Sequence, residues 1–318
     1  MGLLPKGMDI LPPSDDRVFK LLMTSAEESK PVLADLISAT IGEPVKDVVV
    51  RNNEVPSSDT EEKEEVLDVN CLLDGDRQAD VEMQASSLQE EPDGKHQNLI
   101  GKTVFYACDL HSSQGARGKK RYDSLIHTYQ ITFCSYTVFP EKEGFRHTFS
   151  FRDDKDDKQL TDAVRVIMVE LSRLREVLKK PVGKMENLEK WALFLRYANV
   201  PRYRGIVNKI IASKEEIEMA GNLLMSISKD ERERAVFRSR RIYRTDHESD
   251  LATAWDNGRN AGRIEGERMG RIEGERTGER TGKENVAREM IADGVPDESI
   301  MRYTGLTRSE ITALRRGE

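Results

Sequence analysis

The chain has 318 residues, of which 37% are hydrophobic and 34% charged, and at about 150 residues per domain this length predicts about two domains. Its 57 acidic and 50 basic residues give a net charge of −7, which excludes a globally positive surface, so any contact with nucleic acid has to be local. No apolar run reaches the roughly 18 residues of a membrane span, and the first residues lack the apolar core and cleavage site of a signal peptide. We therefore expect a cytoplasmic protein without membrane contact.

Cysteines and histidines do not indicate a zinc site. Cys71, Cys108 and Cys134 are odd in number and widely spaced, which fits neither a disulfide framework nor a zinc knuckle. The five histidines have no metal-ligand spacing either. We expect the three cysteines to pack inside the protein.

Helix and strand patterns alternate along the first half of the chain. Residues 14–42 are predicted to form two helices, with Ser14 as the N-cap of the first and Gly42 at the end of the second. Strand patterns dominate from Val45 to about Phe151, apart from a helix-like segment around residues 97–112. The segment from Thr161 to about Ile242 has the period of helices. This order predicts an α/β core followed by a helical extension.

A repeat with glycine at every fourth position runs from Gly258 to Gly282, with Arg and Glu filling most of the gaps. Each interior glycine costs a helix about 0.8–1 kcal/mol relative to alanine, so the repeat is poorly stable as a lone helix. It is either a flexible linker or a helix that pairs closely with a second helix, in which case the period of four predicts a right-handed supercoil.

The last residues are predicted to form short helices. Gly294 and Pro296 interrupt the first of them, and Thr307 with Glu310 forms a capping box for the last. The apolar residues that could make a small shared core are Ala287, Met290, Ile291, Ile300, Leu306, Ile311 and Leu314. This tail is either a helix-turn-helix that contacts DNA or an assembly element.

The stretch from Val66 to Gln84 is predicted to form a β-hairpin that turns near Gly75. Because side chains alternate between faces, one face of this hairpin is apolar and the other gathers polar and acidic residues. Asp68, Glu82 and Gln84 lie on the polar face, together with Asn70 and Asp80.

The register of the hairpin decides whether two carboxylates meet. A three- or five-residue loop centred on Gly75 places Asp68 opposite Glu82, with Cβ atoms about 4.5–5.5 Å apart, whereas a two-residue loop separates them or breaks the apolar face. Facing carboxylates repel unless a cation neutralises them, and Mg²⁺ or Mn²⁺ prefers such oxygen ligands. Gln84 could orient a water or a phosphate oxygen beside the metal. The other interpretation is a solvated polar sheet face.

These residues resemble a known motif. An acidic residue on one strand, followed on the next by an acidic residue, a spacer and a polar residue, is similar to the PD-(D/E)xK nuclease motif, with Gln84 in place of the usual lysine. The E-x-Q form resembles the Rpn recombination-promoting nucleases, a transposase-like branch. The further segments that resemble this family are DDRVFKLLM, KTVFYACDLH with Lys102 where arginine is more usual, HTFSFRDDKDDKQLTDAVRVIMVELSRL, the glycine repeat and TGLTRSEI.

The resemblance implies a restriction-endonuclease-like three-layer α/β/α core with a mixed sheet and Mg²⁺-dependent DNA cleavage in recombination or mobile-element biology. It assigns metal binding to Asp68 and Glu82 and an activating or positioning role to Gln84. Asp16 would supply a further carboxylate to the metal, while Lys20 either pairs with Asp16 or meets a phosphate. Because Gln84 replaces the lysine, a catalytically degenerate DNA-binding or scaffold protein on the same fold is the alternative.

An acidic protein needs local basic clusters to hold DNA. One candidate cluster lies in the loop QGARGKKR, and it comprises Arg117, Lys119, Lys120 and Arg121. A second, helical cluster comprises Arg232, Arg234, Arg238, Arg240, Arg241 and Arg244. The interpretation of these residues as a solubilising surface stays open.

The predicted domains are a nuclease core at 1–180, a helical extension at 181–250, the glycine repeat at 251–284 and a helix-turn-helix-like tail at 285–318. The repeat is a linker or a helix for homo-oligomer formation. If the tail acts mainly as an assembly element that binds a partner, deleting residues 255–318 should change the oligomeric state and abolish activity at the same time.

Overall fold

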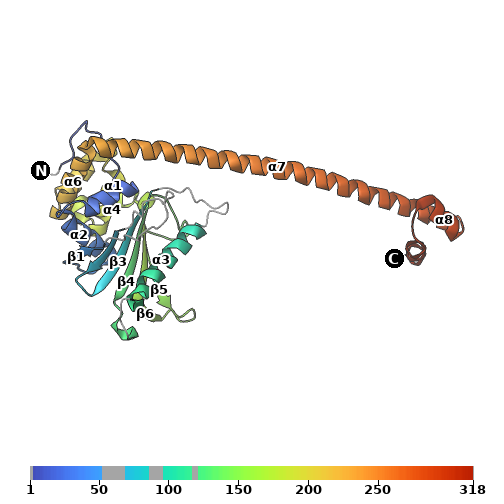
Figure 1. Cartoon of the computed structure of the whole chain (residues 1–318), viewed down its shortest axis with the longest axis horizontal. Helices are drawn as coiled ribbons and strands as arrows, with labels where there is room; N and C mark the ends of the chain where they lie inside the picture. The colour runs from blue at the N-terminus through green and yellow to red at the C-terminus, as the bar shows by residue number, and fades with distance from the viewer. Residues whose placement is uncertain (1–2, 52–68, 86–95, 117–120, 318) are drawn as a thin grey trace. The chain divides into compact units, whose positions relative to one another are not determined.

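A computed structural model describes residues 3–51, 69–85, 96–116 and 121–317. The chain divides into two compact units, Met1–Arg241 and Ile242–Glu318. The first unit has three layers, with a sheet between two layers of helices (Figure 1). This arrangement and the helical region that follows confirm the predicted α/β/α fold class with a mixed sheet and a helical C-terminal extension.

The middle layer is a mixed sheet. Among the described residues six strands pair in the order β1-β2-β3-β4-β6-β5. The strands are β1 (Val48–Val50), β2 (Val69–Leu73), β3 (Arg77–Gln84), β4 (His127–Cys134), β5 (Arg146–Arg152) and β6 (Gln159–Glu170). Strands β3, β4 and β6 run parallel to one another, and the other pairs are antiparallel.

The β2–β3 hairpin has the predicted register. Asn70 pairs with Asp80 and Cys71 with Ala79, and Leu73 and Arg77 close a three-residue loop centred on Gly75. Gly75 has a φ of 81°, in the left-handed region where glycine is unstrained. Val69 and Cys71 therefore share one face with Ala79, Val81 and Met83, and Asn70 shares the other with Asp80 and Glu82, as the pattern predicted.

Strand β6 corrects the sequence analysis, which assigned the segment from Thr161 onward to a helix. The segment is extended to Glu170 and pairs with β4 on one side and β5 on the other. It contains Val164, Val166 and Val169, whose β-branched side chains favour strands. Its apolar residues also matched a helical period, and only the pairing with β4 distinguishes the two structures.

One face of the sheet carries the main hydrophobic core. It is covered by α1 (Asp16–Thr24), α2 (Ser29–Ile41), α4 (Asn187–Tyr197), α5 (Arg204–Ile211) and α6 (Glu215–Lys229). Fully buried side chains from this layer, such as Phe19 and Trp191, join Val81 and Ile131 of the sheet in one cluster. The α4–α6 region thus belongs to the same unit as the sheet.

The opposite face of the sheet is covered by α3 (Gln97–Ala116) (Figure 1). Leu99 of α3 packs on Cys134 and Met168 of β4 and β6, where a small apolar cluster forms. The helix therefore lies over β4 and β6. Among the described residues of the first unit, elements are connected by short 3₁₀ segments at Tyr122–Ser124, Leu171–Arg173, Val177–Lys179, Val182–Lys184 and Pro201–Tyr203.

The first helix begins one residue later than predicted. The N-cap is Asp15, whose Oδ1 accepts a hydrogen bond from the Val18 amide at 3.3 Å, and not Ser14. The Asp15 amide donates to Pro12 O at 3.0 Å, and this turn over residues 12–15 delays the helix. Gly42 ends α2 in a left-handed conformation, as predicted.

The cysteine prediction is correct for two residues. Cys71 and Cys134 are buried, but Cys108 is exposed. Ala107 and Leu110 face the sheet from α3, and the 100° turn per residue carries Cys108 away from that side. No described cysteine is in a disulfide.

The second unit contains most of α7 (Glu231–Ala292), together with α8 (Asp297–Thr304) and α9 (Arg308–Arg316). The glycine repeat lies inside α7. Ala287, Ile300, Leu306 and Ile311 are buried together, and the remaining predicted core residues pack against them. The predicted capping box of Thr307 and Glu310 is present. In the described part of the chain, no helix combines the length and apolar character needed to cross a membrane.

Candidate active site

The polar faces of β3 and β4 form a buried polar patch beneath the edge of α3. Because the parallel strands are paired in register, Asp80 lies beside Gln130 and Glu82 beside Thr132. Alternation puts all four side chains on the α3 side of the sheet. Asp80 is 5% exposed and Glu82 is 4% exposed. Two carboxylates on neighbouring positions of one face are therefore removed from bulk water.

On the other side of β3, the buried Asn70 of β2 lies opposite Asp80. Asp68, two residues before Asn70, lies outside the described residues. The observed register is the one from which the sequence analysis paired Asp68 with Glu82. That pairing stays a prediction.

Glu82 has an ionic partner on α3. The Nζ of Lys102 contacts Glu82 Oε1, and it lies 5.6 Å from the centre of the Tyr106 ring. The Glu82 side chain is 6% exposed and that of Lys102 is 36% exposed, so the lysine connects the buried carboxylate with the surface. A buried carboxylate is costly unless it is paired in this way.

Several oxygen atoms of the patch have no hydrogen-bond donor among the described residues. They are Glu82 Oε2, Gln130 Oε1 and Thr132 Oγ1. An unsatisfied buried polar atom costs about 1–3 kcal/mol. Oxygen atoms of this kind are the ligands that Mg²⁺ prefers, so the donor set is of the right chemical type for a hard cation.

A complete metal centre needs a ligand from elsewhere. Within the described ranges, no three His, Cys, Asp or Glu side chains gather in one place. Glu82 is the predicted ligand in the described part of this patch, with Asp80 beside it, and further carboxylates have to come from other parts of the chain. Asp68 is the acidic residue that the register would bring to this face.

Burial raises the pKa of Asp80 to about 6. The Gln130 amide, which donates to Asp80 Oδ2 at 2.9 Å, and the charge of Lys102 lower this pKa, while the charge of Glu82 raises it. A cation at this patch would favour the ionised form of Asp80.

A hydrogen-bond network fixes α3 on the sheet. Gln78 of β3 donates from Nε2 to Leu110 O and to Thr128 Oγ1, both at 2.9 Å, and His111 Nδ1 lies 2.9 Å from Thr128 Oγ1. Gln114 closes the network by hydrogen bonds to the backbone of Ile126. Because α3 is held at several points, the position of Lys102 beside Glu82 is determined by the fold.

The remaining predicted residues of this region lie at the end of β3. Gln84 is half-buried on the same face as Glu82. The next amide, that of Ala85, donates to Asp16 Oδ1 at 3.2 Å, which ties α1 to the strand end. Lys20 lies one turn further along α1. Their roles in metal or phosphate binding stay predictions.

The predicted DNA-binding loop is only partly described. Arg117, Lys119 and Lys120 lie outside the described residues, and Arg121 is exposed and paired with Asp123. Arg121 precedes β4, and at 3.3 Å per residue the start of this strand is about 16 Å from Thr132. The structure thus separates Arg121 from Glu82, and a bound DNA would have to extend over both.

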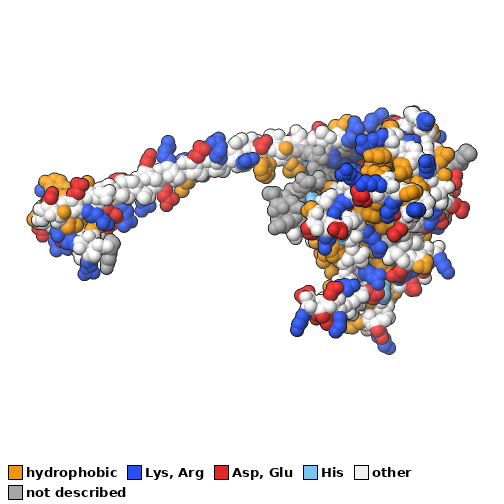
Figure 2. Space-filling model, turned by 180° about the vertical axis from the view of Figure 1, so that it is seen from behind, with side chains coloured by type: hydrophobic (Ala, Val, Ile, Leu, Met, Phe, Trp, Pro, Cys, Tyr) orange, Lys and Arg blue, Asp and Glu red, His pale blue; other side chains and the backbone are white. Residues whose placement is uncertain are grey.

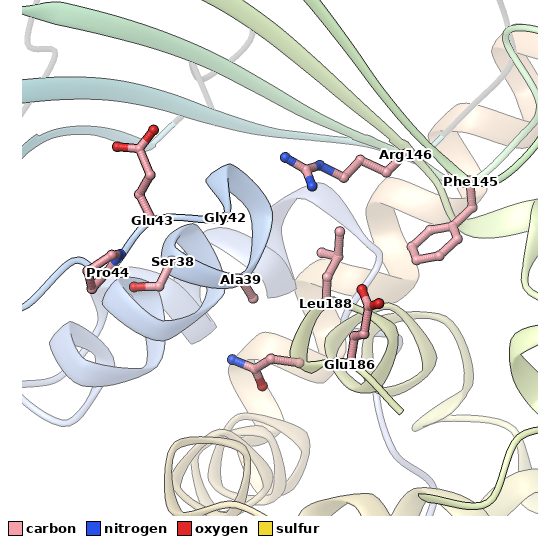
Figure 3. A pocket seen from close by; sticks show the side chains of 10 residues that line it. Ser38, Ala39, Gly42, Glu43, Pro44, Phe145, Arg146, Glu186 and Leu188 are labelled. Carbon is pink, nitrogen blue, oxygen red and sulfur yellow. The ribbon is translucent and has the colours of Figure 1, made fainter. Parts of the chain in front are cut away.

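A separate pocket of about 410 Å³ lies on the opposite face of the sheet (Figure 3). It is lined by the end of α2, the start of α4, Phe145, and Arg146 at the start of β5. Glu43 at its edge forms ion pairs with Arg77 and Arg165. It contains none of the predicted site residues.

Sequence reasoning assigned no role to Asp80, Gln130 or Thr132, and it noted Lys102 only as a departure from the resemblance. The run TYQITF alternates polar and apolar residues, and this signal identifies a second polar strand. Lys102 could not be found in this way because it reaches Glu82 from a helix on another layer.

Comparisons with known families agree with this architecture. The family described as PD-(D/E)XK nuclease family transposase matches residues 13–254. The C-terminal HTH domain of the Rpn/YhgA-like nuclease family matches residues 280–316. Neither a curated protein nor a solved structure matches the chain.

Proposed function

The chain belongs to the PD-(D/E)XK nuclease family transposases, and from this membership we propose that it is a metal-dependent DNA endonuclease that acts in recombination. The observation that carries the proposal is the buried Glu82, which has one oxygen on Lys102 and a second without a donor among the described residues. A solvated polar sheet face would not bury two carboxylates in this way.

We assign Asp68 and Glu82 as ligands of Mg²⁺ or Mn²⁺, with Asp16 as a further carboxylate at the end of β3. When bound, such an ion polarises the phosphoryl group and lowers the pKa of an attacking water. Asp80 adds negative charge beside Glu82. The carboxylates of this chain hold the cation and orient it toward the substrate.

Lys102 supplies the positive charge that Gln84 lacks. Its ammonium lies at Glu82 at the surface end of the patch, where an approaching phosphate would meet it. Gln84 has an amide that can position a water or a phosphate oxygen but carries no charge. We therefore divide the role of the usual lysine between Gln84, as a positioning group, and Lys102, as the cation.

DNA is the proposed polymer substrate. The helix-turn-helix match at residues 280–316 supports a second nucleic-acid-binding element besides the proposed nuclease core. Of its arginines, Arg315 is paired with Asp297 at 2.8 Å. Lys20 and the basic loop around Arg121 are the proposed phosphate contacts of the core.

We propose further that the glycine repeat of α7 mediates self-association. If a Cβ atom is added at any glycine of the repeat, it has no neighbouring atom within 4 Å among the described residues, apart from the helix itself. Leu251, Trp255 and Met269 on the same helix are exposed, and acidic and basic side chains are interspersed along it (Figure 2). A second copy of the helix could approach closely along the glycines and cover these apolar side chains.

The test is cleavage of supercoiled plasmid by wild type and by Glu82→Ala, each with Mg²⁺, with Mn²⁺ and with EDTA. We expect metal-dependent cutting by wild type and a loss of at least about a hundredfold in the variant, since removing a charge-stabilising group costs about that much. Asp68→Ala tests the second predicted metal ligand and should cause a similar loss of cleavage. Val49→Ala, an exposed change on β1, is the matched control.

Cleavage by Glu82→Ala at the wild-type rate would contradict the assigned site. Binding of DNA without cutting, by a folded wild type under either metal, would instead identify the degenerate DNA-binding protein, with Gln84 as the first residue to change to lysine.

A further inference from the structure

Two aromatic side chains lie exposed on α3 next to the candidate site. Phe105 is 66% exposed and Tyr106 is 37% exposed. Their ring centres are 5.7 Å apart, and the planes meet at 70°. Neither ring belongs to a buried cluster of the described residues. Both rings therefore lie outside the buried clusters of the described residues, and Phe105 is the more exposed of the two.

The aromatic pair begins one helical turn from Lys102. Lys102 and Tyr106 are four residues apart and share a side of α3, with the lysine Nζ 5.6 Å from the ring centre. The same Nζ contacts Glu82. Since a helical turn is about 5.4 Å, a group bound at Glu82 and a group on the rings are near neighbours.

We propose that Phe105 and Tyr106 form a stacking platform for an unpaired nucleobase that flanks the scissile phosphate, so that the substrate is single-stranded or locally unpaired DNA. The proposal rests on the proposed nuclease function and names its substrate class. Each base that stacks on an aromatic side chain contributes about 1–3 kcal/mol. A base inside a duplex has both faces covered by its neighbours and cannot use the rings.

Charge favours a nucleotide over an apolar protein segment as the occupant. Lys102 provides a cation at one end of the platform, where the phosphate of a stacked nucleotide would lie. Asp109, which is exposed one turn further along α3, repels phosphate at the other end. The backbone of the strand is therefore directed toward Glu82.

The test uses the full-length protein in EDTA, so that binding is measured without cleavage. The probe is an oligonucleotide that contains 2-aminopurine, either single-stranded or paired in a duplex. We expect the wild type to quench the fluorescence of the single strand and to bind it more tightly than the duplex. Phe105→Ala together with Tyr106→Ala should weaken single-strand binding by about tenfold and remove the quenching.

Two further variants separate ring stacking from simple apolar contact and from a general effect of changing α3. Phe105→Leu together with Tyr106→Leu keeps apolar side chains but removes both rings, so this variant should lose quenching as the double alanine variant does. Val104→Ala, at a position 49% exposed on another side of α3, should bind as wild type. Full binding and quenching by this double leucine variant would mean that apolar contact and not ring stacking holds the base, and it would overturn the platform.

The outcomes distinguish this inference from the proposed function. Quenching by wild type without any cutting under Mg²⁺ would support the platform while the nuclease proposal fails. Metal-dependent cutting of single-stranded and duplex DNA at equal rates, unchanged in the double alanine variant, would overturn the platform while the nuclease stands.

Discussion

Under the proposed function, Glu82 and Lys102 would link the stability of the protein to its chemistry. Lys102→Met leaves the buried Glu82 without its partner. We expect a loss of about 1–3 kcal/mol in the free energy of unfolding, measured by urea titration in EDTA. Glu82→Gln added to Lys102→Met removes the uncompensated charge and should recover most of this loss.

The same variants should behave differently in catalysis. Lys102→Arg keeps the charge and should retain cleavage, whereas Lys102→Met and the double variant should both be inactive. Wild-type cleavage by Lys102→Met would show that the lysine serves stability alone. A double-mutant cycle on both readouts measures the coupling between the two side chains.

Thiol reactivity follows from burial at the level of single cysteines. Burial raises the pKa of Cys71 to about 12, and it also raises the pKa of Cys134. The reactive species is the thiolate, so neither residue should react at pH 8 in the folded protein. Cys108 is exposed. We expect a thiol-reactive dye to label one cysteine in the native protein and three after unfolding, and Cys108→Ser to abolish the native labelling.

At the scale of elements, the β2–β3 hairpin depends on its turn. Gly75 has a φ of 81°. Gly75→Ala forces a side chain into the left-handed region and should destabilise the protein by about 1–2 kcal/mol, measured by urea unfolding. Gly101 of α3 is the matched control, because a Cβ there meets open space. Gly101→Ala should stabilise the protein by about 0.8–1 kcal/mol. If both variants lost the same amount of unfolding free energy, the left-handed conformation of Gly75 would not be the cause.

The glycines of α7 allow a test in which helix stability and association change in opposite directions. Replacing Gly258, Gly262 and Gly266 by alanine should stabilise the isolated helix by about 0.8–1 kcal/mol each. If two helices meet along these glycines, the added methyl groups separate them, and sedimentation equilibrium should show a shift toward monomer. Asn260→Ala, on the other side of the helix, should leave association unchanged. Equal association in both variants would exclude the glycine interface.

At the scale of the whole molecule, the two units should contribute different parts of DNA binding. The sheet and its helices are one compact unit that ends at Arg241. A chain ending after residue 254 should keep metal-dependent cleavage, bind DNA more weakly, and show a smaller dependence of affinity on salt, because fewer phosphates are contacted. If this shortened chain folds but loses cleavage and changes its oligomeric state, the result would instead support the alternative in which the C-terminal tail assembles the active protein.

The sequence by itself determined the features that depend on neighbouring residues. The alternation of side chains and the short loop at Gly75 predicted the register of β2 and β3, and with it the face that carries Glu82 and Gln84. The small core of the C-terminal helices was predicted residue by residue from apolar spacing and caps. In both cases the signal lies within a few residues of the structure that it predicts.

Only the tertiary structure decided the features that join distant segments. Strand β6 has apolar spacing compatible with a helix, and its parallel pairing with β4 makes it a strand. Lys102 reaches Glu82 from α3, and Gln130 reaches Asp80 from β4. Such contacts depend on which strands pair and where a helix crosses the sheet, and these are set by the packing of the whole unit. The sequence therefore specified Glu82 and the face on which it lies, and the fold supplied the ammonium group of Lys102 and the buried oxygen atoms of the candidate site.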